Sequence, residues 1–392
     1  MNVIIKGPLL SVTGYGVHAR QVFSWCLSQG WNIQCQVVPW GICTYYLDPE
    51  QEGGLIGEIT KRTAPFPLGA TPDVSFQIIL PDEWDPSLAP KNIGITAGVE
   101  TNKCSPNWVQ ACNAMDHVIV PSTFTKQMFV NSGVKADHIS VVPEAYTCGS
   151  SETAEKQEII KTIDSLPTKF NFLMFGQLTG QDPDSDRKNT FYGLKWFAEA
   201  FKDDPDVGIV VKTNMGRLTA MDRHQTRGIF ESLINEIRQG PYPKFYLAHG
   251  LMDGNEISGL YQANSIKALV APTRGEGWGL PILDAAVNGL PVIATNSTGH
   301  MDFMAKVKFL TLDYDLIDVP PQKLDGRIWI QGTKWAHVRE ASLKKRLLKF
   351  RKSSDLPAQW ANEAAPNLSE EYSLSSVIQK YTEAWENLTS GG

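Results

Sequence analysis

The chain has 392 residues, of which 42% are hydrophobic and 20% are charged, so a wholly disordered, collagen-like or coiled-coil protein is excluded. At about 150 residues per domain, this length favours two domains. The formal net charge of −6 argues against a general nucleic-acid or anionic-membrane binder, although a local basic patch could still serve such a partner.

Two further features bear on location. No stretch approaches about 20 uninterrupted apolar residues, so we expect no membrane span, and the first residues do not have the order of a secretory signal. The six cysteines form no CxxC pair, a pattern typical of reduced cytosolic thiols. We therefore expect a cytoplasmic protein without disulfides.

The first 143 residues alternate between apolar strands and helical patterns, as at the start of a doubly wound sheet. A glycine turn, Gly14-Tyr15-Gly16, joins the first strand to the first helix, and the polar stretch 147–156 is the expected linker. The expected strands are 2–10, 33–38, 74–80, 91–96, 117–120 and 138–142, and the expected helices are 17–29, 106–113 and 123–132.

A second alternation follows the linker, and its strands are apolar almost throughout, as in sheets that helices cover on both faces. The sequence thus predicts an α/β fold of two Rossmann-like, doubly wound domains that face each other across a cleft, where ligands bind at the strand ends. Residues 313–366 are less regular. The expected strands are 170–176, 207–212, 244–247, 268–271 and 292–295, and the expected helices are 191–201, 225–238, 255–262, 281–288, 342–352 and 369–388.

The strongest chemical signal is the segment 274–294, which reads RGEGWGLPILDAAVNGLPVIA and follows an apolar strand. Pro281 suits the start of a helix and Gly289 suits its end. The helix N-terminus therefore offers free N–H groups to an anionic or hydroxylated ligand. Glu276, just before the helix, and Asp284, about one turn inside it, can both reach one polyhydroxylated ligand.

The second signal is a pair of adjacent cations, Arg187 and Lys188, after the strand that ends in Phe175-Gly176-Gln177. Arg binds phosphate oxygens bidentately and Lys adds a point charge, so the pair suits a diphosphate. A solvated basic turn is the alternative. The aspartates within 182–186 could suit a hard cation, but the run has no EF-hand length, so we expect a polar loop and no metal site.

These two segments resemble the donor-binding signature of retaining GT-B glycosyltransferases of family 4, with its Glu-x7-Glu pattern. The resemblance implies transfer of a sugar from a nucleotide-diphosphate sugar, such as a UDP- or GDP-sugar, to a hydroxyl acceptor, with no cofactor or metal required. It implies that Glu276 contacts the transferred sugar and that Asp284, one methylene shorter than the family's Glu, binds the ribose. Arg187 and Lys188 match the family's phosphate-binding pair, although Gln177 stands where the family has Arg.

The resemblance extends to other turns of the predicted domains. The family's first glycine loop lies over the donor phosphates and the acceptor, the amides before the signature helix hold the sugar, and the nucleobase packs on a turn after a strand of the second domain. The residues of this chain that match as donor-binding positions are Gly14, Gly16, Gly277, Trp278, Gly279, Leu280, His249, Gly250 and Leu251.

One candidate catalytic residue belongs to the first domain. Many family members place a His in the cleft after the fourth strand, whereas this sequence offers Glu100, as one subset does. A carboxylate there could orient or deprotonate the acceptor hydroxyl, and a turn contact is the alternative. Gly14 to Gly16 alone also mimics a dinucleotide fingerprint, but Pro39-Trp40 ends the second strand without an acid for a nicotinamide ribose.

We expect residues 1–155 to form the acceptor-side domain, 156–368 the donor domain, and the terminal helix, within 369–392, to return to the first domain, as in the family. A saccharide or glycoconjugate is the default acceptor. Six cations within 344–352 keep open a phage-type transfer to a modified DNA base, or a membrane-surface contact. A non-catalytic nucleotide-sugar binder is a further alternative, and phosphorylase-like chemistry would need a pyridoxal lysine that no motif demands.

Overall fold

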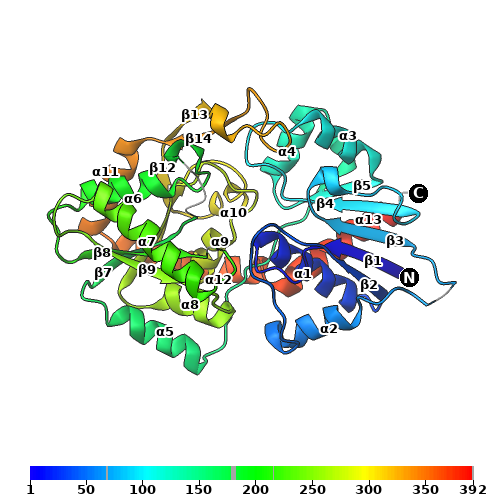
Figure 1. Cartoon of the computed structure of the whole chain (residues 1–392), viewed down its shortest axis with the longest axis horizontal. Coiled ribbons are helices and arrows are strands. Elements are labelled where there is room, and N and C mark those ends of the chain that lie inside the picture. Colours follow the sequence, from blue (N-terminus) through cyan, green and yellow to red (C-terminus); the bar gives the residue numbers. More distant parts are fainter. Residues whose placement is uncertain (68, 178–181, 215, 391–392) are drawn as a thin grey trace. The chain divides into compact units, whose positions relative to one another are not determined.

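The computed structural model describes residues 1–67, 69–177, 182–214 and 216–390. The chain forms two compact units (Figure 1). The first unit comprises Met1–Ala145, Leu324–Thr333 and Glu371–Gly392, and the second comprises Tyr146–Lys323 and Lys334–Glu370. The chain therefore passes from the first unit to the second after Ala145, ten residues before the expected boundary. The short segment Leu324–Thr333, which was expected in the donor domain, belongs to the first unit.

The first unit is built on a six-stranded parallel sheet in the order β2-β1-β3-β4-β5-β6. Every residue of β3 and β5 is buried, and all of them except Gln77 and His117 are apolar or small, as expected of strands that helices cover on both faces. Its strands are β1 (Asn2–Gly7), β2 (Asn32–Val37), β3 (Val74–Ile78), β4 (Lys91–Ile95), β5 (His117–Val120) and β6 (Ile139–Val141), and its helices are α1 (Gly14–Ser28), α2 (Leu55–Lys61), α3 (Pro106–Ala114), α4 (Thr123–Ser132) and α13 (Leu374–Ser390).

The glycine segment after β1 is the first turn of helix α1 and not a separate turn, so this prediction was wrong. Thr13 caps the helix, and its side chain accepts a hydrogen bond from the amide of Gly16. A Cβ atom on Gly16 would lie 2.0 Å from the carbonyl oxygen of Ser11, so only glycine fits there. The close approach of this helix turn to the end of β1 thus explains the second glycine of the motif.

Helix α13 packs on α1 in the first unit, as predicted for the C-terminal helix. Trp25 stacks on Tyr381 with 5.2 Å between ring centroids, and Trp385 meets the edge of Phe76 at 5.6 Å. The hydroxyl of Tyr381 and Nε2 of buried His18 also share a 2.8 Å hydrogen bond. Burial of several aromatic side chains, each about 150–250 Å², is the main source of this attachment.

The expected terminal helix 369–388 is in fact split. Helix α12 (Asp355–Glu371) belongs to the second unit up to Glu370, and α13 begins at Leu374 in the first unit. Between them, Ser373 accepts hydrogen bonds from the amides of Ser376, through its hydroxyl, and Val377, through its carbonyl. Ser373 therefore acts as the N-cap of a new helix at the point where the chain crosses between units. Residues 391–392, the last two of the segment predicted to return to the first domain, lie outside the described residues.

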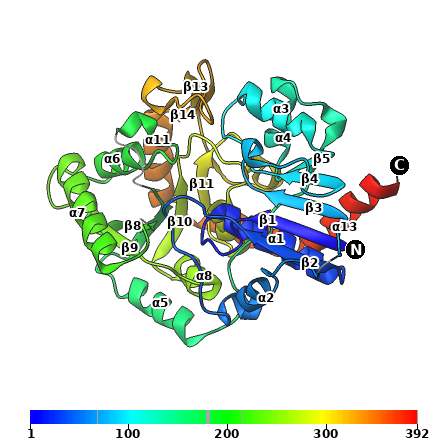
Figure 2. The same ribbon diagram turned by 45° about the vertical axis from the view of Figure 1, so that its right-hand side comes forward.

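The second unit contains another six-stranded parallel sheet, in the order β12-β11-β10-β7-β8-β9, and helices flank both sheets (Figure 2). Its strands are β7 (Phe170–Phe175), β8 (Val207–Thr213), β9 (Lys244–His249), β10 (Ile266–Ala271), β11 (Val292–Thr295) and β12 (Leu310–Leu312), and its helices are α5 (Ala154–Asp164), α6 (Thr190–Ala200), α7 (Ala220–Ile237), α8 (Gly254–Gln262), α9 (Leu280–Val287), α10 (Met301–Met304), α11 (Glu340–Lys352) and α12.

Two segments of the second unit are more regular than expected. Within 313–366, strands β13 (Tyr314–Asp318) and β14 (Lys334–Val338) pair antiparallel, and α12 follows the basic helix α11. Helix α5 starts at Ala154, inside the predicted linker. Short 3-10 turns complete the fold at Gln51–Gly54, Pro81–Glu83, Ala136–His138, Pro183–Ser185 and Pro321–Lys323.

Candidate functional site

Arg274 organises the two loops that carry the predicted donor-binding residues. It follows β10 and is fully buried in the second unit. Its Nε donates to the carbonyl oxygen of Asp186 (3.0 Å), its Nη1 donates to Nδ1 of His337 (2.8 Å), and its guanidinium lies over the ring of Trp335. The amide of Arg274 also donates to the carbonyl oxygen of Arg187 (2.9 Å). Arg274 thereby fixes the loop after β7 against the loop after β10.

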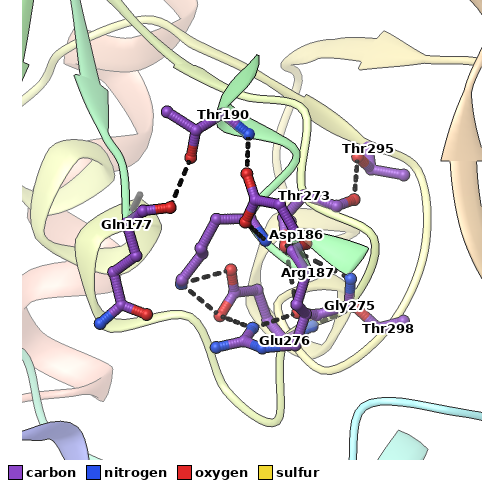
Figure 3. Close-up of polar contacts among 10 residues, drawn as sticks. Gln177, Asp186, Arg187, Thr190, Thr273, Gly275, Glu276, Thr295 and Thr298 are labelled. Atoms are coloured by element: carbon purple, nitrogen blue, oxygen red, sulfur yellow. Dashed lines mark hydrogen bonds and ion pairs between the residues drawn. The ribbon is translucent and has the colours of Figure 1, made fainter. Parts of the chain in front are cut away.

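These loops bring three predicted site residues together. The ammonium of Lys188 donates to both carboxylate oxygens of Glu276, at 2.7 and 2.9 Å. Nη1 of Arg187 donates to the carbonyl oxygen of Gly275 (2.5 Å) and to Oε2 of Glu276 (3.3 Å), as Figure 3 shows. The three charged groups thus form one cluster at the carboxyl end of the sheet.

Hydrogen bonds from their backbone amides hold two members of this cluster, Lys188 and Glu276, in place. The carboxylate of Asp186 accepts hydrogen bonds from the amide of Lys188 (2.9 Å) and from the amide of Thr190 (2.5 Å) at the start of α6. The amide of Glu276 donates to the hydroxyl of Thr298 (3.0 Å), a non-glycine residue with a φ of +76°. A strained residue at such a place indicates that the surrounding structure prescribes the position of Glu276.

The two cations decide the charge of Glu276. This residue is only 7% exposed, and its burial by itself would raise the pKa of the carboxyl group. The charges of Lys188 and Arg187 and the hydrogen bond from Lys188 outweigh that effect and lower the pKa to about 2. Glu276 is therefore a carboxylate at neutral pH, able to accept hydrogen bonds but not to donate a proton.

The segment after Glu276 forms the start of α9. Gly279 precedes the helix with a φ of +100°, a conformation that glycine adopts without strain, and Leu280 is the first helical residue. Buried Trp278 meets the edge of the Phe303 ring at 5.0 Å. The helix N-terminus, with its N–H groups and the positive end of its dipole, therefore lies four residues after Glu276, one residue earlier than the start predicted at Pro281.

Asp284 lies in the same helix but contacts the linker. Its Oδ1 accepts a hydrogen bond from the amide of Thr147 (2.7 Å), and its Oδ2 accepts one from the Thr147 hydroxyl (2.5 Å). The amide of Cys148 adds a longer contact at 3.4 Å. Burial raises the pKa of Asp284 to about 6, and these hydrogen bonds limit the rise. Asp284 therefore anchors the start of the second unit, an interaction that the sequence pattern did not indicate.

The predicted nucleobase turn follows β9. His249 is the last residue of this strand, Gly250 follows it, and Leu251 is partly exposed. The carbonyl oxygen of Gly250 accepts a 2.6 Å hydrogen bond from the ammonium of Lys212, on the neighbouring strand β8. Lys212 was not identified from the sequence, because a single lysine at the end of an apolar strand carries no motif.

Glu100, Gly14 and Gly16 belong to the first unit, and the other predicted site residues belong to the second. The hydroxyl of Tyr15, between the two glycines, lies 2.8 Å from that of Thr96, and it accepts a hydrogen bond from the amide of Ala97. This link ties the first turn of α1 to the end of β4, four residues before half-buried Glu100. Within the first unit, the glycine motif and Glu100 thus lie at the same edge of the sheet.

Arg274 and Thr298 also emerged only from the structure. Both were part of segments that the sequence singled out, yet an Arg before a glycine and a Thr in a turn have no distinctive chemistry by themselves. Their roles depend on contacts with residues 88 and 22 positions away in the sequence. A positive φ at a non-glycine residue is visible only in three dimensions.

Several other properties concern the described part of the chain. All six cysteines are free thiols. Outside the few undescribed positions, no group of three or more His, Cys, Asp or Glu side chains is arranged to hold a metal ion. None of the described helices is both long enough and apolar enough to cross a membrane.

No protein-family model and no curated protein sequence matches this chain. Solved structures match over nearly its whole length. HepE from Anabaena, solved in complex with UDP-glucose, has a TM-score of 0.67 at 12% identity, covering 99% of this chain and 100% of its own. A glycosyltransferase from Rickettsia africae has a TM-score of 0.65 at 14% identity, covering 100% and 99%. A sucrose-phosphate synthase from Thermosynechococcus elongatus has 0.64 at 12%, covering 100% and 99%.

These similarities define the class of fold. Two parallel sheets of six strands with flanking helices, each in a Rossmann-like unit, constitute the GT-B fold, and the predicted fold class is confirmed. The solved neighbours are GT-B glycosyltransferases, and at 12–14% identity the likeness extends to the fold alone.

Proposed function

We propose that this protein is a retaining glycosyltransferase of the family 4 type, which transfers a sugar from a nucleotide-diphosphate sugar to a hydroxyl acceptor. The observation that carries the proposal is the cluster of Glu276, Lys188 and Arg187 beside the N-terminus of α9. The similarity to HepE, a protein solved with UDP-glucose, supports a UDP-sugar or a related donor.

The cations of the cluster would bind the donor diphosphate. Departure of a nucleoside diphosphate places negative charge on its oxygens, and preorganised positive groups stabilise that charge in the transition state. Lys188 and Arg187 supply two positive charges, and the N-terminus of α9, from Gly277 to Leu280, adds backbone N–H groups. No metal is needed in this scheme.

The carboxylate of Glu276 would hold the transferred sugar. Because its pKa is about 2, it remains an acceptor of hydrogen bonds at neutral pH and is suited to sugar hydroxyls. Once a diphosphate engages Lys188, the carboxylate oxygens that now bind its ammonium become available to the donor sugar. The acceptor would then attack the face from which the leaving group departs, so we assign no covalent nucleophile.

The remaining assignments complete the proposed site. We propose that Asp284 contacts the ribose and shares its oxygens with Thr147, because a carboxylate can accept several hydrogen bonds at once. We propose that Glu100 orients the acceptor hydroxyl. The nucleobase would pack on the turn His249–Leu251, with Gly14 and Gly16 over the donor and the acceptor.

A saccharide or glycoconjugate is the proposed acceptor. The basic helix α11 does not favour a DNA acceptor, because three of its six cations are engaged within the second unit. Lys344 pairs with Glu199 and Glu340, and Arg351 pairs with Asp204 at 3.0 Å. Arg346 donates to the carbonyl oxygen of Thr311 (3.0 Å).

The test is a panel of UDP- and GDP-sugars, screened by thermal shift and then incubated with saccharide acceptors. Mass spectrometry identifies the product, and NMR of the new linkage establishes whether the anomeric configuration is retained. Glu276→Ala and Lys188→Ala should remain folded but lose transfer, whereas Lys345→Ala, at an exposed position of α11, should behave as wild type. Full turnover in both site variants would refute the assignment, and donor binding without hydrolysis or transfer would indicate a non-catalytic binder.

A further inference from the structure

Lys212 is a buried cation that the proposed mechanism does not yet use. It lies on β8 with only 3% of its surface exposed. Its ammonium donates to the side-chain oxygen of Asn214 and to the carbonyl oxygen of Gly250, both at 2.6 Å. Both acceptors are neutral, so these contacts satisfy the ammonium's hydrogen bonds in part without cancelling its charge.

The charge of Lys212 is not paired within the described part of the chain, where no carboxylate lies within 4.0 Å of its ammonium. Burial lowers the pKa of Lys212 to about 8, and the field of Glu256 offsets this only in part. The other deeply buried lysine of the second unit, Lys156, pairs directly with Glu152. Because an uncompensated buried charge is costly, its presence at this position requires an explanation.

The position of Lys212 suggests that explanation. In the sheet, β8 lies between β7 and β9, and Lys212 is in register with Phe175 on one side and Ala248 on the other. The loop after β7 leads to Arg187 and Lys188, and the turn after β9 contains Gly250. The ammonium is therefore at the carboxyl edge, where parallel sheets bind ligands, between the two loops proposed to bind diphosphate and base.

We propose that Lys212 is a third cation for the donor, whose charge attracts the diphosphate of the nucleotide while its hydrogen bond holds the Gly250 turn. This inference rests on the proposed function, since it needs a nucleoside diphosphate to bind the second unit. It explains why this position holds a lysine, although a neutral donor would satisfy the same two oxygens. An incoming polyanion supplies the missing counter-charge.

A purely structural role makes a different prediction. If Lys212 only held the Gly250 turn, its loss would weaken the nucleoside and the nucleoside diphosphate equally, because both place the base on that turn. If its charge acts on the diphosphate, removal of Lys212 weakens the affinity for the nucleoside diphosphate more than the affinity for the nucleoside. A change of one unit charge across a few ångströms of protein corresponds to at least about a tenfold change in affinity.

The experiment measures Kd by calorimetry for UDP and uridine, or for GDP and guanosine if the guanine donor is preferred. Lys212→Met should weaken binding of the diphosphate at least about tenfold more than it weakens binding of the nucleoside. Lys212→Arg, which keeps the charge, should recover most of the affinity. Lys345→Met serves as the control at an exposed lysine of the same unit, and circular dichroism confirms that each variant is folded; Lys212→Gln replaces Lys212→Met if the latter does not fold.

Equal losses for nucleoside and diphosphate, or unchanged diphosphate affinity in Lys212→Met, would overturn the inference while leaving the proposed function intact. Absence of nucleoside diphosphate binding by the wild-type protein would overturn both. These results are therefore distinguishable within one set of titrations.

Discussion

Glu276→Gln tests whether the charged cluster is built for an anionic ligand. The carboxylate has a pKa of about 2, against an ordinary value of 4.5, so the folded structure favours its charged form by about 3 kcal/mol. Glutamine removes this charge and leaves Lys188 and Arg187 close together without their counter-ion. The variant should be less stable by roughly 1–3 kcal/mol at neutral pH, since both cations are about one-fifth exposed and partly screened.

The same change should affect binding and catalysis in opposite directions. A diphosphate no longer has to displace Glu276 from Lys188, and the site gains one net positive charge. We therefore expect Glu276→Gln to bind UDP or GDP as tightly as wild type or up to about tenfold more tightly. Transfer should fall by at least about a hundredfold, because an amide replaces the carboxylate that we propose holds the sugar.

The assay compares urea unfolding, calorimetric binding of the nucleoside diphosphate, and transfer rate in both proteins. Glu231→Gln, at an exposed position of α7, provides the matched control for loss of one negative charge from the second unit. The stability difference should also shrink as the pH falls from about 4.5 toward 2, because Glu276 of the unfolded wild-type chain takes up a proton there while the folded carboxylate is still charged. A large loss of nucleotide affinity in Glu276→Gln would contradict the reasoning, since it would mean that the cations need Glu276 in order to bind phosphate.

Two further predictions concern buried polar groups outside this cluster. Burial raises the pKa of Asp284 to about 6 from an ordinary 3.8, so the folded protein binds this proton more strongly than the unfolded chain between those values. Relative to Asp284→Asn, the wild type should therefore be about 1 kcal/mol more stable against unfolding at pH 5 than at pH 7. A stability difference that does not change with pH would contradict the raised pKa of Asp284. Tyr381→Phe removes the buried hydroxyl that is bonded to His18, and it should destabilise the first unit by about 1–3 kcal/mol in urea unfolding. The control Tyr314→Phe, in the second unit, should not be destabilised. Equal stability of the two variants would refute a contribution of this hydrogen bond to holding α13.

Much of the fold could be predicted because buried parallel strands are apolar along their whole length. The strands His117–Val120 and Val292–Thr295 and the helix Thr123–Ser132 have the bounds predicted from the sequence. Prediction failed where a tertiary contact overrides the local pattern. The glycines after β1 begin a helix because Gly16 packs on Ser11, and the hairpin of β13 and β14 lacks a short turn to mark it.

The residues of the candidate site could be predicted from the sequence, whereas their contacts could not. Its members Glu276, Asp284, Arg187 and Lys188 were recognised because their residue types and local spacing suit a sugar and a diphosphate. Their partners were not recognised, because hydrogen bonds across the fold leave no periodic trace in the sequence. Lys188 meets Glu276 across 88 positions of the chain, and Asp284 meets Thr147 across 137.

The sequence by itself therefore determined the class of fold and the charged side chains of the candidate site. It could do so because burial and helix capping impose short-range patterns on residue type. Only the tertiary structure decided how those groups are used. It pairs Glu276 with two cations that set its charge, turns Asp284 toward the linker, and buries Lys212 with no carboxylate partner among the residues that the structure describes. Charge, burial and partner are properties of the folded surroundings, and the packing of distant loops at one sheet edge creates them.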